Sequence, residues 1–404
     1  MMHKSRGDIR RFTILLSFLI CFLFLFGSCG AEEQKIPENS HGTESPAEDP
    51  PQTKEPIVTE YQKYLNEKYK DDKEMEYGLD ITKKTNLVAI CYSMWFNAIL
   101  GDGNKEPSDV YNITEILAGN GDWGPENAFH YWARPQLGYY RSTDKTVIRT
   151  HMTQLAEAGV DFIILDYTYC RDGWYGSAAW TSYVQKPCKA LLDTIVKMRE
   201  EGLRTPYVVF WGGAPTLESD LFENFYRYFY SKEQWKDCFV YWEGKPFALT
   251  WTKEDQSIDT FTIRGMNGLR TDLDPGQWSF LNITNVPSYG ADGFVEQVGV
   301  CVAAQETYMS EPTAHGRNHG IFFYEQWQTA FKYRPKIVTL TWWNEWAAQR
   351  DAQNRFVDNY NMEYSRDIEP MDGGHGDQYY RWMCEYIRAY RAGEECPRLV
   401  EAGY

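Results

Sequence analysis

Short apolar runs alternate with amphipathic helical stretches along most of this 404-residue chain, and this alternation restricts the folds that the chain can adopt. Runs rich in β-branched and aromatic residues predict strands at residues 87–96, 160–168, 207–211, 239–242 together with 247–251, 261–264 (a weak pattern), 277–283, 297–303 and 337–343. Apolar residues at helical spacing predict helices at residues 147–158, 186–199, 217–230, 322–333 and 377–391. No Pro- or Ser-rich linker interrupts the series, so we expect one domain over residues 57–404.

The number and order of these units favour a parallel α/β fold. A (β/α)8 TIM barrel requires eight such strands in alternation with helices. A doubly wound sheet would be expected to carry a Gly-rich phosphate-binding loop after its first strand, and no such loop is present in the sequence. We therefore expect a TIM barrel, with irregular units between Thr252 and Pro312, where the strand patterns are weakest.

The stretch IVTLTWWNEWAAQR, which begins at Ile337, indicates where a functional site would lie. Its first part has no charge and is typical of a parallel strand covered on both faces. Asn344 and Glu345 follow at the carboxyl end, where parallel α/β folds bind their ligands. We predict that Glu345 is catalytic and that Trp343, Asn344 and Trp346 contact substrate; the alternative is a buried glutamate that joins two loops.

The stretch from Asn97 to Arg141, after the first expected strand, is the longest loop in this prediction. Long loops in compact domains are often functional, and a loop that follows a barrel strand lies at the carboxyl face. We expect His130 to contact the substrate by hydrogen bonding and Trp132 by stacking, with Trp211 at the end of the third strand as a further contact. The alternative is that the loop's aromatic residues pack it onto the barrel rim.

Composition restricts the partners of the chain. Its formal charge of -16 makes a nucleic-acid partner unfavourable, whereas an aromatic share of 16% provides surfaces for stacking on sugars. Seven cysteines after Cys29 lack the spacing of a zinc site and are expected mainly in the core, with Cys384 and Cys396 as a candidate pair. The acidic stretch 351–358 could supply oxygen ligands to calcium or another metal, which is the alternative left open, but it lacks EF-hand spacing. We assign no metal site and expect no redox or nucleotide cofactor.

The N-terminal residues 1–29 combine a basic segment, an apolar run and a break of small residues before Cys29, and they resemble a bacterial lipoprotein signal peptide. We expect lipidation of Cys29, with ordinary cleavage or a retained anchor as alternatives. Residues 30–56 are rich in Pro, Glu and Ser and predict a disordered tether. The expected location is the outer membrane, facing either the cell surface or the periplasm, with the N-terminal lipid as the contact with the membrane.

Two further stretches, together with the motif Asn344-Glu345-Trp346 (NEW), resemble a known family. YYRSTDKTVIRTHMTQLAEAGVDFIILDYTY (Tyr139 to Tyr169), TWWNEWAAQR and SRDIEP occur in an order that resembles the glycoside hydrolase family 71/99-like group. That group includes endo-acting α-mannosidases, α-1,3-glucanases and WbsX-type proteins. The resemblance implies a TIM-barrel enzyme that acts on α-linked polysaccharide or glycan chains.

One position departs from the mannosidase pattern. In that branch the motif is NEWxE and its two glutamates share the chemistry, whereas here Glu345 is followed by Ala348 at the second position. Glycoside hydrolysis ordinarily requires two carboxyl groups, so either another residue supplies the second or the chain is a glycan-binding protein that does not cut. In SRDIEP, we expect Arg366, Asp367 and Glu369 to fix the loop.

Asp166 is the predicted second carboxyl group. It ends an apolar run, so it should emerge at the carboxyl end of the second strand, which closure of a barrel brings near the eighth. The alternatives are that Asp166 caps the following loop or pairs with Arg171. Asp292 and Glu325 are the other carboxyl groups considered for this role.

Overall fold

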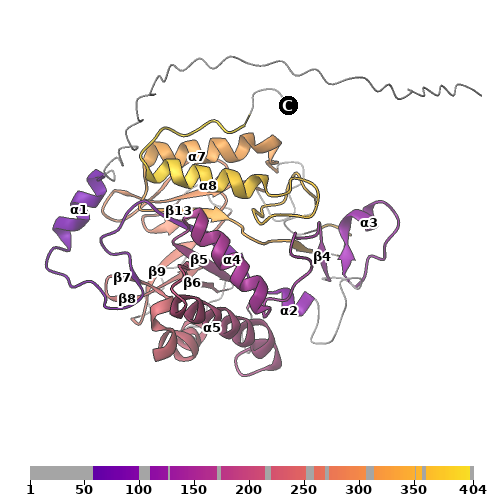
Figure 1. Ribbon diagram of the computed structural model, residues 1–404, viewed down its shortest axis with the longest axis horizontal. Helices are drawn as coiled ribbons and strands as arrows, with labels where there is room; N and C mark the ends of the chain where they lie inside the picture. Colours follow the sequence, from indigo (N-terminus) through magenta and orange to yellow (C-terminus); the bar gives the residue numbers. More distant parts are fainter. Residues whose placement is uncertain are drawn as a thin grey trace, which may run out of the picture. The chain divides into compact units, whose positions relative to one another are not determined.

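A sheet of mainly parallel strands forms the centre of the fold (Figure 1). Eight parallel strands lie side by side in the order in which the chain visits them. From β12 through β13, β2, β5, β6, β8 and β9 to β10, every neighbouring pair is parallel, so the eighth of these strands lies beside the first. Their bounds are β2 (Leu87–Ser93), β5 (Phe162–Tyr167), β6 (Tyr207–Gly212), β8 (Lys245–Thr250), β9 (Thr262–Met266), β10 (Gln277–Trp278), β12 (Val295–Cys301) and β13 (Ile337–Thr341).

The strand order is that of the predicted TIM barrel, but the barrel is not closed. Within the described residues, β10 and β12 form no backbone ladder. The side chain of Gln297 bridges the gap, because its Nε2 donates to the carbonyl oxygen of Ser279 at 2.8 Å. A Cβ atom at Gly299 would lie 2.7 Å from that same oxygen, so only glycine permits this approach. The opening lies within the segment from Thr252 to Pro312 that the sequence predicts to be irregular.

The computed structural model describes residues 58–99, 110–125, 128–170, 174–213, 220–251, 259–268, 273–305, 314–350, 352–356 and 361–400. They belong to one compact unit, which begins at Lys54. The expected signal peptide, tether and lipidation site at Cys29 lie outside these residues. Over the ranges given, no helix has the length and apolar character needed to cross a membrane.

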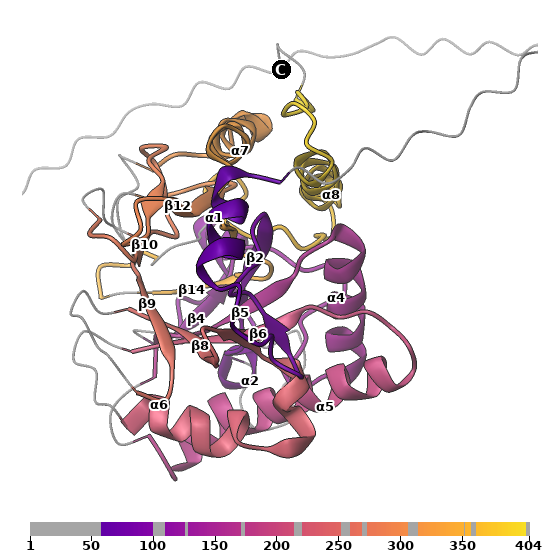
Figure 2. The same ribbon diagram turned by 90° about the vertical axis from the view of Figure 1, so that its left-hand side faces the viewer.

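The helices expected from the sequence are present and cover the outside of the sheet (Figure 2). One of them, α4 (Lys145–Ala158), begins where Asp144 accepts hydrogen bonds from two backbone amides and ends at Gly159, which has a φ of 89°. The others are α5 (Lys186–Glu200), α6 (Asp220–Phe225) with a π-helical continuation (Tyr226–Tyr230), α7 (Ile321–Tyr333) and α8 (Gln378–Arg391). Helices α7 and α8 pack against each other, with Trp327 stacked on Tyr386.

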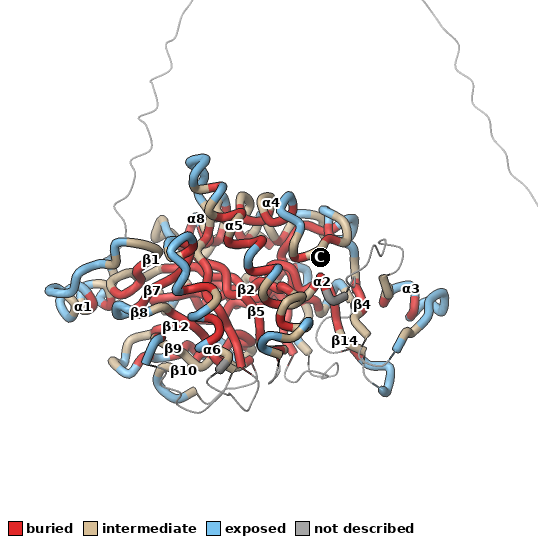
Figure 3. Tube along the Cα trace, turned by 90° about the horizontal axis from the view of Figure 1, so that it is seen from below, coloured by how far each residue is buried: buried red, intermediate tan, exposed pale blue. Residues whose placement is uncertain are grey.

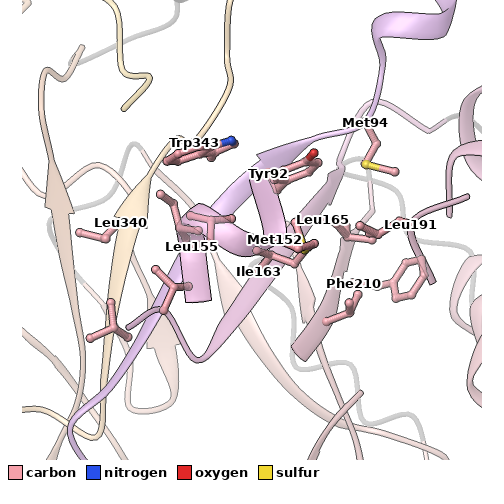
Figure 4. Packing of buried hydrophobic residues seen from close by; sticks show 14 of the residues in the cluster. Tyr92, Met94, Met152, Leu155, Ile163, Leu165, Leu191, Phe210, Leu340 and Trp343 are labelled. Carbon is pink, nitrogen blue, oxygen red and sulfur yellow. The ribbon is translucent and has the colours of Figure 1, made fainter. Parts of the chain in front are cut away.

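Buried residues form separate cores on the two faces of the sheet, because side chains alternate along each strand. Ile90 and Ile163 point outward to the helices, whereas Ala89 and Ile164 point to the interior. Figure 4 shows the outer core, where Leu340 packs among residues of the neighbouring strands and α4. Although β9 is mostly half-buried, β2 and β5 are buried along their whole length (Figure 3), and so are β13 and most of β6. Burial on both faces explains why their sequences are almost continuously apolar.

The long segment after β2 contains a small sheet as well as loops. It includes α2 (Phe96–Ile99), β3 (Tyr111–Asn112), α3 (Ile113–Leu117) and β4 (Phe129–Tyr131). A strand beyond β13, β14 (Ala347–Gln349), pairs antiparallel with β4 and completes this sheet, which lies at the opposite end of the strands from α1 (Glu60–Lys68) in Figure 1. The remaining strands are β1 (Leu79–Asp80), β7 (Val240–Trp242) and β11 (Ser288–Tyr289).

Candidate active site

Glu345 follows β13 at the carboxyl edge of the parallel sheet, and only 2% of its surface is exposed. Both carboxylate oxygens accept hydrogen bonds from Arg366, at 2.9 Å from Nε and 3.0 Å from Nη2. The guanidinium also lies over the ring of Trp342, 4.5 Å from its centroid. A bidentate guanidinium favours the ionised carboxylate, so Glu345 is suited to accept a proton or to stabilise positive charge.

Sequence reasoning missed the direct contact of Arg366 with Glu345 and assigned Arg366 only to its own loop. A buried carboxylate nearly always requires a cationic or hydrogen-bonding partner. That requirement is the signal that could have identified an arginine partner for Glu345, although it could not have chosen Arg366 among the arginines of the chain.

Asp166 lies at the carboxyl end of β5, level with the start of the turn that carries Glu345. It pairs in register with Ser93 of β2, and the backbone amide of Ser93 donates to Oδ1 of Asn344 at 2.8 Å. Burial raises the pKa of the Cys91 thiol, and the negative charges of Asp166 and Glu345 raise it further. The two predicted carboxyl groups therefore lie at one edge of the sheet, around the end of β2.

One oxygen of Asp166 has a local structural role. Its Oδ1 accepts hydrogen bonds from the backbone amide of Thr168 at 2.9 Å and from Oγ1 of Thr168 at 2.7 Å, which fixes the start of the following loop. This is the capping role that the sequence leaves open. The other alternative, a pair with Arg171, lies outside the described residues, and a catalytic role of Asp166 stays a prediction.

Aromatic side chains line the interior of the sheet beside these carboxyl groups. Trp211, in register with Asp166, packs against Trp251, Phe280 and Trp342, with ring centroids 5.8, 5.0 and 6.0 Å away. The buried Nε1 atoms of Trp211 and Trp342 have no hydrogen-bond acceptor within the described residues. A buried indole N–H usually has a partner, so these two donors are suited to a sugar hydroxyl or a water molecule.

The three residues around Glu345 that the sequence predicts as substrate contacts are used inside the protein. Trp343 belongs to the outer core (Figure 4), and Nε1 of Trp346 donates to Glu369 at 2.6 Å. Asn344 joins two segments, because its Nδ2 donates to the carbonyl oxygen of Ser93 at 3.2 Å. All three are fully buried, which argues against contact with a glycan; that contact stays a prediction.

His130 and Trp132 pack the small sheet onto the rest of the fold. The ring nitrogens of His130 lie 2.8 Å from the carbonyl oxygen of Ala128 and 3.0 Å from that of Trp123, and burial lowers its pKa. Trp132 stacks on Trp346 with ring centroids 5.3 Å apart. Both side chains are buried, so the geometry supports the packing alternative that the sequence leaves open, and their contact with a glycan stays a prediction.

The SRDIEP loop is held by buried polar contacts. Glu369 accepts hydrogen bonds from the hydroxyl of Tyr140 and from Nε1 of Trp346, both at 2.6 Å, and its other oxygen lies 2.9 Å from Nε2 of His151. Asp367 accepts from Nε1 of Trp132 at 3.1 Å. These contacts agree with the expected loop-fixing role of Asp367 and Glu369.

Solved structures with a similar fold include the GH99 endo-alpha-mannosidase from Bacteroides thetaiotaomicron, with 14% sequence identity and a TM-score of 0.50. That match covers 77% of this chain and 99% of that chain. The chain has the fold of this GH99 enzyme. The resemblance to the family 71/99-like group is thus confirmed at the level of the fold.

Two further matches to the GH99-like fold are weaker. The same mannosidase in complex with bis-tris propane aligns with a TM-score of 0.48 and 14% identity, over 76% of this chain and 98% of that chain. A structure described as a glycoside hydrolase-like protein aligns with a TM-score of 0.44 and 14% identity, over 75% and 94% of the two chains. No family model matches the chain, and no curated protein matches it.

Within this GH99-like fold, the other candidates for the second carboxyl group lie in unsuitable places. Oδ1 of Asp292 accepts from the amide of Phe294, and Phe294 stacks on Tyr61 of α1, which lies at the amino end of the strands. Glu325 is exposed on the outer helix α7. These positions, on α7 and beside α1, argue against both groups for this role.

The described cysteines and acidic residues form no further site in the GH99-like fold. Cys384 and Cys396 are both free, so the candidate disulfide is absent, and the other five described cysteines are free and buried. No group of three or more His, Cys, Asp or Glu side chains that could hold a metal ion occurs in the described ranges. Asp351 and Asp358 lie outside them.

Ala348, at the motif position where the mannosidase branch carries a glutamate, is buried in the small sheet of the GH99-like fold. It pairs with His130 across β14 and β4, and 1% of its surface is exposed. We expect Ala348→Glu to lower the free energy of unfolding by at least about 3 kcal/mol, because a buried carboxylate without a cation is strongly destabilising. Chemical denaturation tests this, with Ala348→Ser as the small polar control. An Ala348→Glu variant as stable as the wild type would contradict the placement.

Proposed function

We propose that the chain is a glycoside hydrolase that acts on α-linked glycan or polysaccharide chains. The observation that carries the proposal is the Glu345 carboxylate, held by Arg366 at the carboxyl edge of a parallel α/β sheet beside buried tryptophans. Hydrolytic sites of such folds are built from residues at this edge. The GH99-like fold supports the glycoside hydrolase class, and the α-linkage rests on the sequence motifs.

The two carboxyl groups have different roles in this proposal. Arg366 favours the ionised form of Glu345, so Glu345 acts as the base or nucleophile. Asp166, buried and flanked by Tyr167 and Tyr169, acts as the proton donor, because burial favours the protonated form of a carboxyl group. Trp211 and Trp342 provide indole donors and apolar surface for the sugar next to the bond that is cut.

We expect Asp166→Asn to lower turnover by about 100-fold or more, because the amide cannot donate the proton that the leaving group requires. Thr168→Val is the matched control, since it removes the hydroxyl that donates to Asp166 and leaves the carboxyl group in place. Turnover on a substrate with an activated leaving group should recover part of the loss in Asp166→Asn. If Asp166→Asn is fully active, or is only as impaired as Thr168→Val, Asp166 is a loop cap alone.

The proposal as a whole is tested by incubating the protein with a panel of α-linked mannans, glucans and complex glycans and measuring new reducing ends. We expect hydrolysis of at least one substrate and none by Glu345→Gln. If no substrate in the panel is cut, hydrolysis as a function is contradicted.

A second candidate function is a surface glycan-binding protein that does not cut. It is favoured by the absence of a carboxylate at position 348, where the side chain is a methyl group buried in the small sheet. Binding of a glycan from the same panel without any release of reducing ends would support this function over hydrolysis.

We also propose that the protein is held at the outer membrane by a lipid on Cys29. The support is the basic segment, the apolar run and the small residues before Cys29 in the sequence. Cys29→Ala, made in the full-length chain in a Gram-negative host, is expected to abolish labelling by a palmitate analogue and to release the protein from the membrane fraction. Labelling that survives the substitution would refute the assignment.

A further inference from the structure

A cavity separate from the Glu345 site lies between the N-terminal ends of α7 and α8. Its volume is about 370 Å³, within the size range of small-molecule sites. It shares no lining residue with the aromatic group around Trp211. The lining residues are Arg317, His319, Met362, Glu363, Gly374, His375, Gln378, Tyr379 and Trp382.

Two side chains that line this cavity, Arg317 and His375, carry buried polar atoms without hydrogen-bond partners. Arg317 is 2% exposed; its Nη2 donates to Oγ of Ser365 and to the carbonyl oxygen of Asp367, each at 2.7 Å, but Nε and Nη1 donate to nothing in the described chain. Nε2 of His375 is buried and lacks a hydrogen bond as well, whereas Oδ2 of Asp367, which does not line the cavity, lies 3.6 Å from Nη2 of Arg317. Among the lining residues, all of which lie in the described ranges, only Arg317 and His375 carry such atoms. Such atoms in a native protein usually face water or a ligand.

The unpaired atoms include both donors and acceptors. Burial, and then the charge of Arg317, lower the pKa of His375 to about 3, so its ring is neutral at pH 7. Nδ1 of His375 lies 3.2 Å from the carbonyl oxygen of Gly376 and therefore carries the proton, which makes Nε2 an acceptor. Arg317 offers only donors. A hydroxyl group can satisfy both kinds of atom, whereas an oxyanion can only accept.

Aromatic rings form the walls of the cavity. Tyr379 is buried under Arg317, whose guanidinium lies 4.3 Å from the ring centroid. Trp382, one turn along α8, meets Tyr379 edge to face with centroids 5.1 Å apart and is partly exposed. An aromatic face beside a mixed set of donors and acceptors suits the apolar C–H face and the hydroxyl groups of a sugar ring.

We propose that this cavity is a second carbohydrate site, which binds one residue of a neutral glycan. Because α7 and α8 each follow a strand of the parallel sheet, their N-terminal ends lie toward the same face as Glu345. A polysaccharide held at this cavity stays close to the Glu345 site, which raises its effective concentration there. The binding does not depend on hydrolysis.

The test measures binding of a panel of neutral oligosaccharides and polysaccharides, built from mannose, glucose, galactose and xylose in α and β linkage, to Glu345→Gln. Trp382→Ala and His375→Leu, each added to this background, are expected to weaken binding of at least one polysaccharide about tenfold or more. Tyr289→Ala, which removes an aromatic side chain that is 43% exposed on β11, is the matched control and should bind as the parent does. Circular dichroism spectra check that each variant is folded.

Two results would overturn the proposal. The first is equal binding of the whole panel by the parent, Trp382→Ala and His375→Leu. That result would show that the cavity binds no glycan and that water satisfies its unpaired atoms. The second is displacement of the bound glycan from the cavity by inorganic sulfate at millimolar concentration, which would identify an oxyanion site. Every arm of this test measures binding in the Glu345→Gln background. Absence of glycosidase activity in the wild-type protein would therefore contradict the proposed function without changing the outcome of this test.

Discussion

Glu345→Gln is expected to lower glycan turnover by at least about 100-fold while the protein stays folded, because glutamine keeps the volume of the side chain and removes the ionisable group. Glutamine can accept one hydrogen bond from Arg366 but cannot form the charged bidentate pair seen at 2.9 and 3.0 Å. The loss should therefore appear mainly in kcat, with some loss of stability. Steady-state kinetics on a substrate found in the panel provide the measurement.

Glu325→Gln is the matched control for this substitution. Glu325 lies exposed on α7, so the same chemical change should leave both kcat and stability unaltered. If Glu345→Gln keeps wild-type turnover in a folded protein, the assignment of Glu345 is wrong.

Arg366→Met is expected to have the largest effect on stability. The substitution keeps most of the side-chain volume but leaves the Glu345 carboxylate buried without its cation, and removal of one partner from a buried pair costs about 3–5 kcal/mol. Trp342 also loses the guanidinium that lies 4.5 Å over its ring. We expect Arg366→Met to unfold at a lower denaturant concentration than the wild type and to have lower activity.

A double-mutant cycle separates the ion pair from simple packing. In Glu345→Gln/Arg366→Met no charge remains unpaired, so its stability should exceed the value obtained by adding the two single losses. Arg366→Lys, which keeps the charge and loses the bidentate geometry, should fall between the wild type and Arg366→Met. Simple additivity of the two single substitutions would show that Arg366 does not act through Glu345.

Most of the strands and helices could be predicted from the sequence, because hydrophobic periodicity and capping residues are local signals. The strand that begins at Leu87 and the helix that ends before Gly159 are examples. Closure of the barrel was not predictable in the same way. It depends on how the short strand β10 meets β12, and there a side chain, Gln297, takes the place of a backbone ladder.

The position of Glu345 at the sheet edge follows from the sequence, but the identity of its neighbours does not. The expected strand runs to Trp343, and strict alternation from Ile337 would turn Trp343 into the interior. The strand instead ends at Thr341, and the amide of Trp342 donates to the carbonyl oxygen of Arg366 at 2.7 Å. The alternation shifts there, so Trp342 enters the interior and Trp343 joins the outer core.

The tertiary contact that buries His130 and Trp132 could not be predicted from the sequence. The sequence correctly places their loop after β2 but gives no sign that β14 returns from beyond Glu345 to pair with β4. That pairing buries both side chains between two segments that are more than 200 residues apart. Such contacts are not encoded in local periodicity.

A crystal structure of Glu345→Gln with an oligosaccharide from the panel would show directly where the glycan binds. We expect a sugar ring within hydrogen-bond distance of residue 345, between the ends of β13 and β5, with a hydroxyl that accepts from Nε1 of Trp211 or Trp342. A glycan bound only elsewhere on the protein, with no sugar at the carboxyl edge of the sheet, would contradict it.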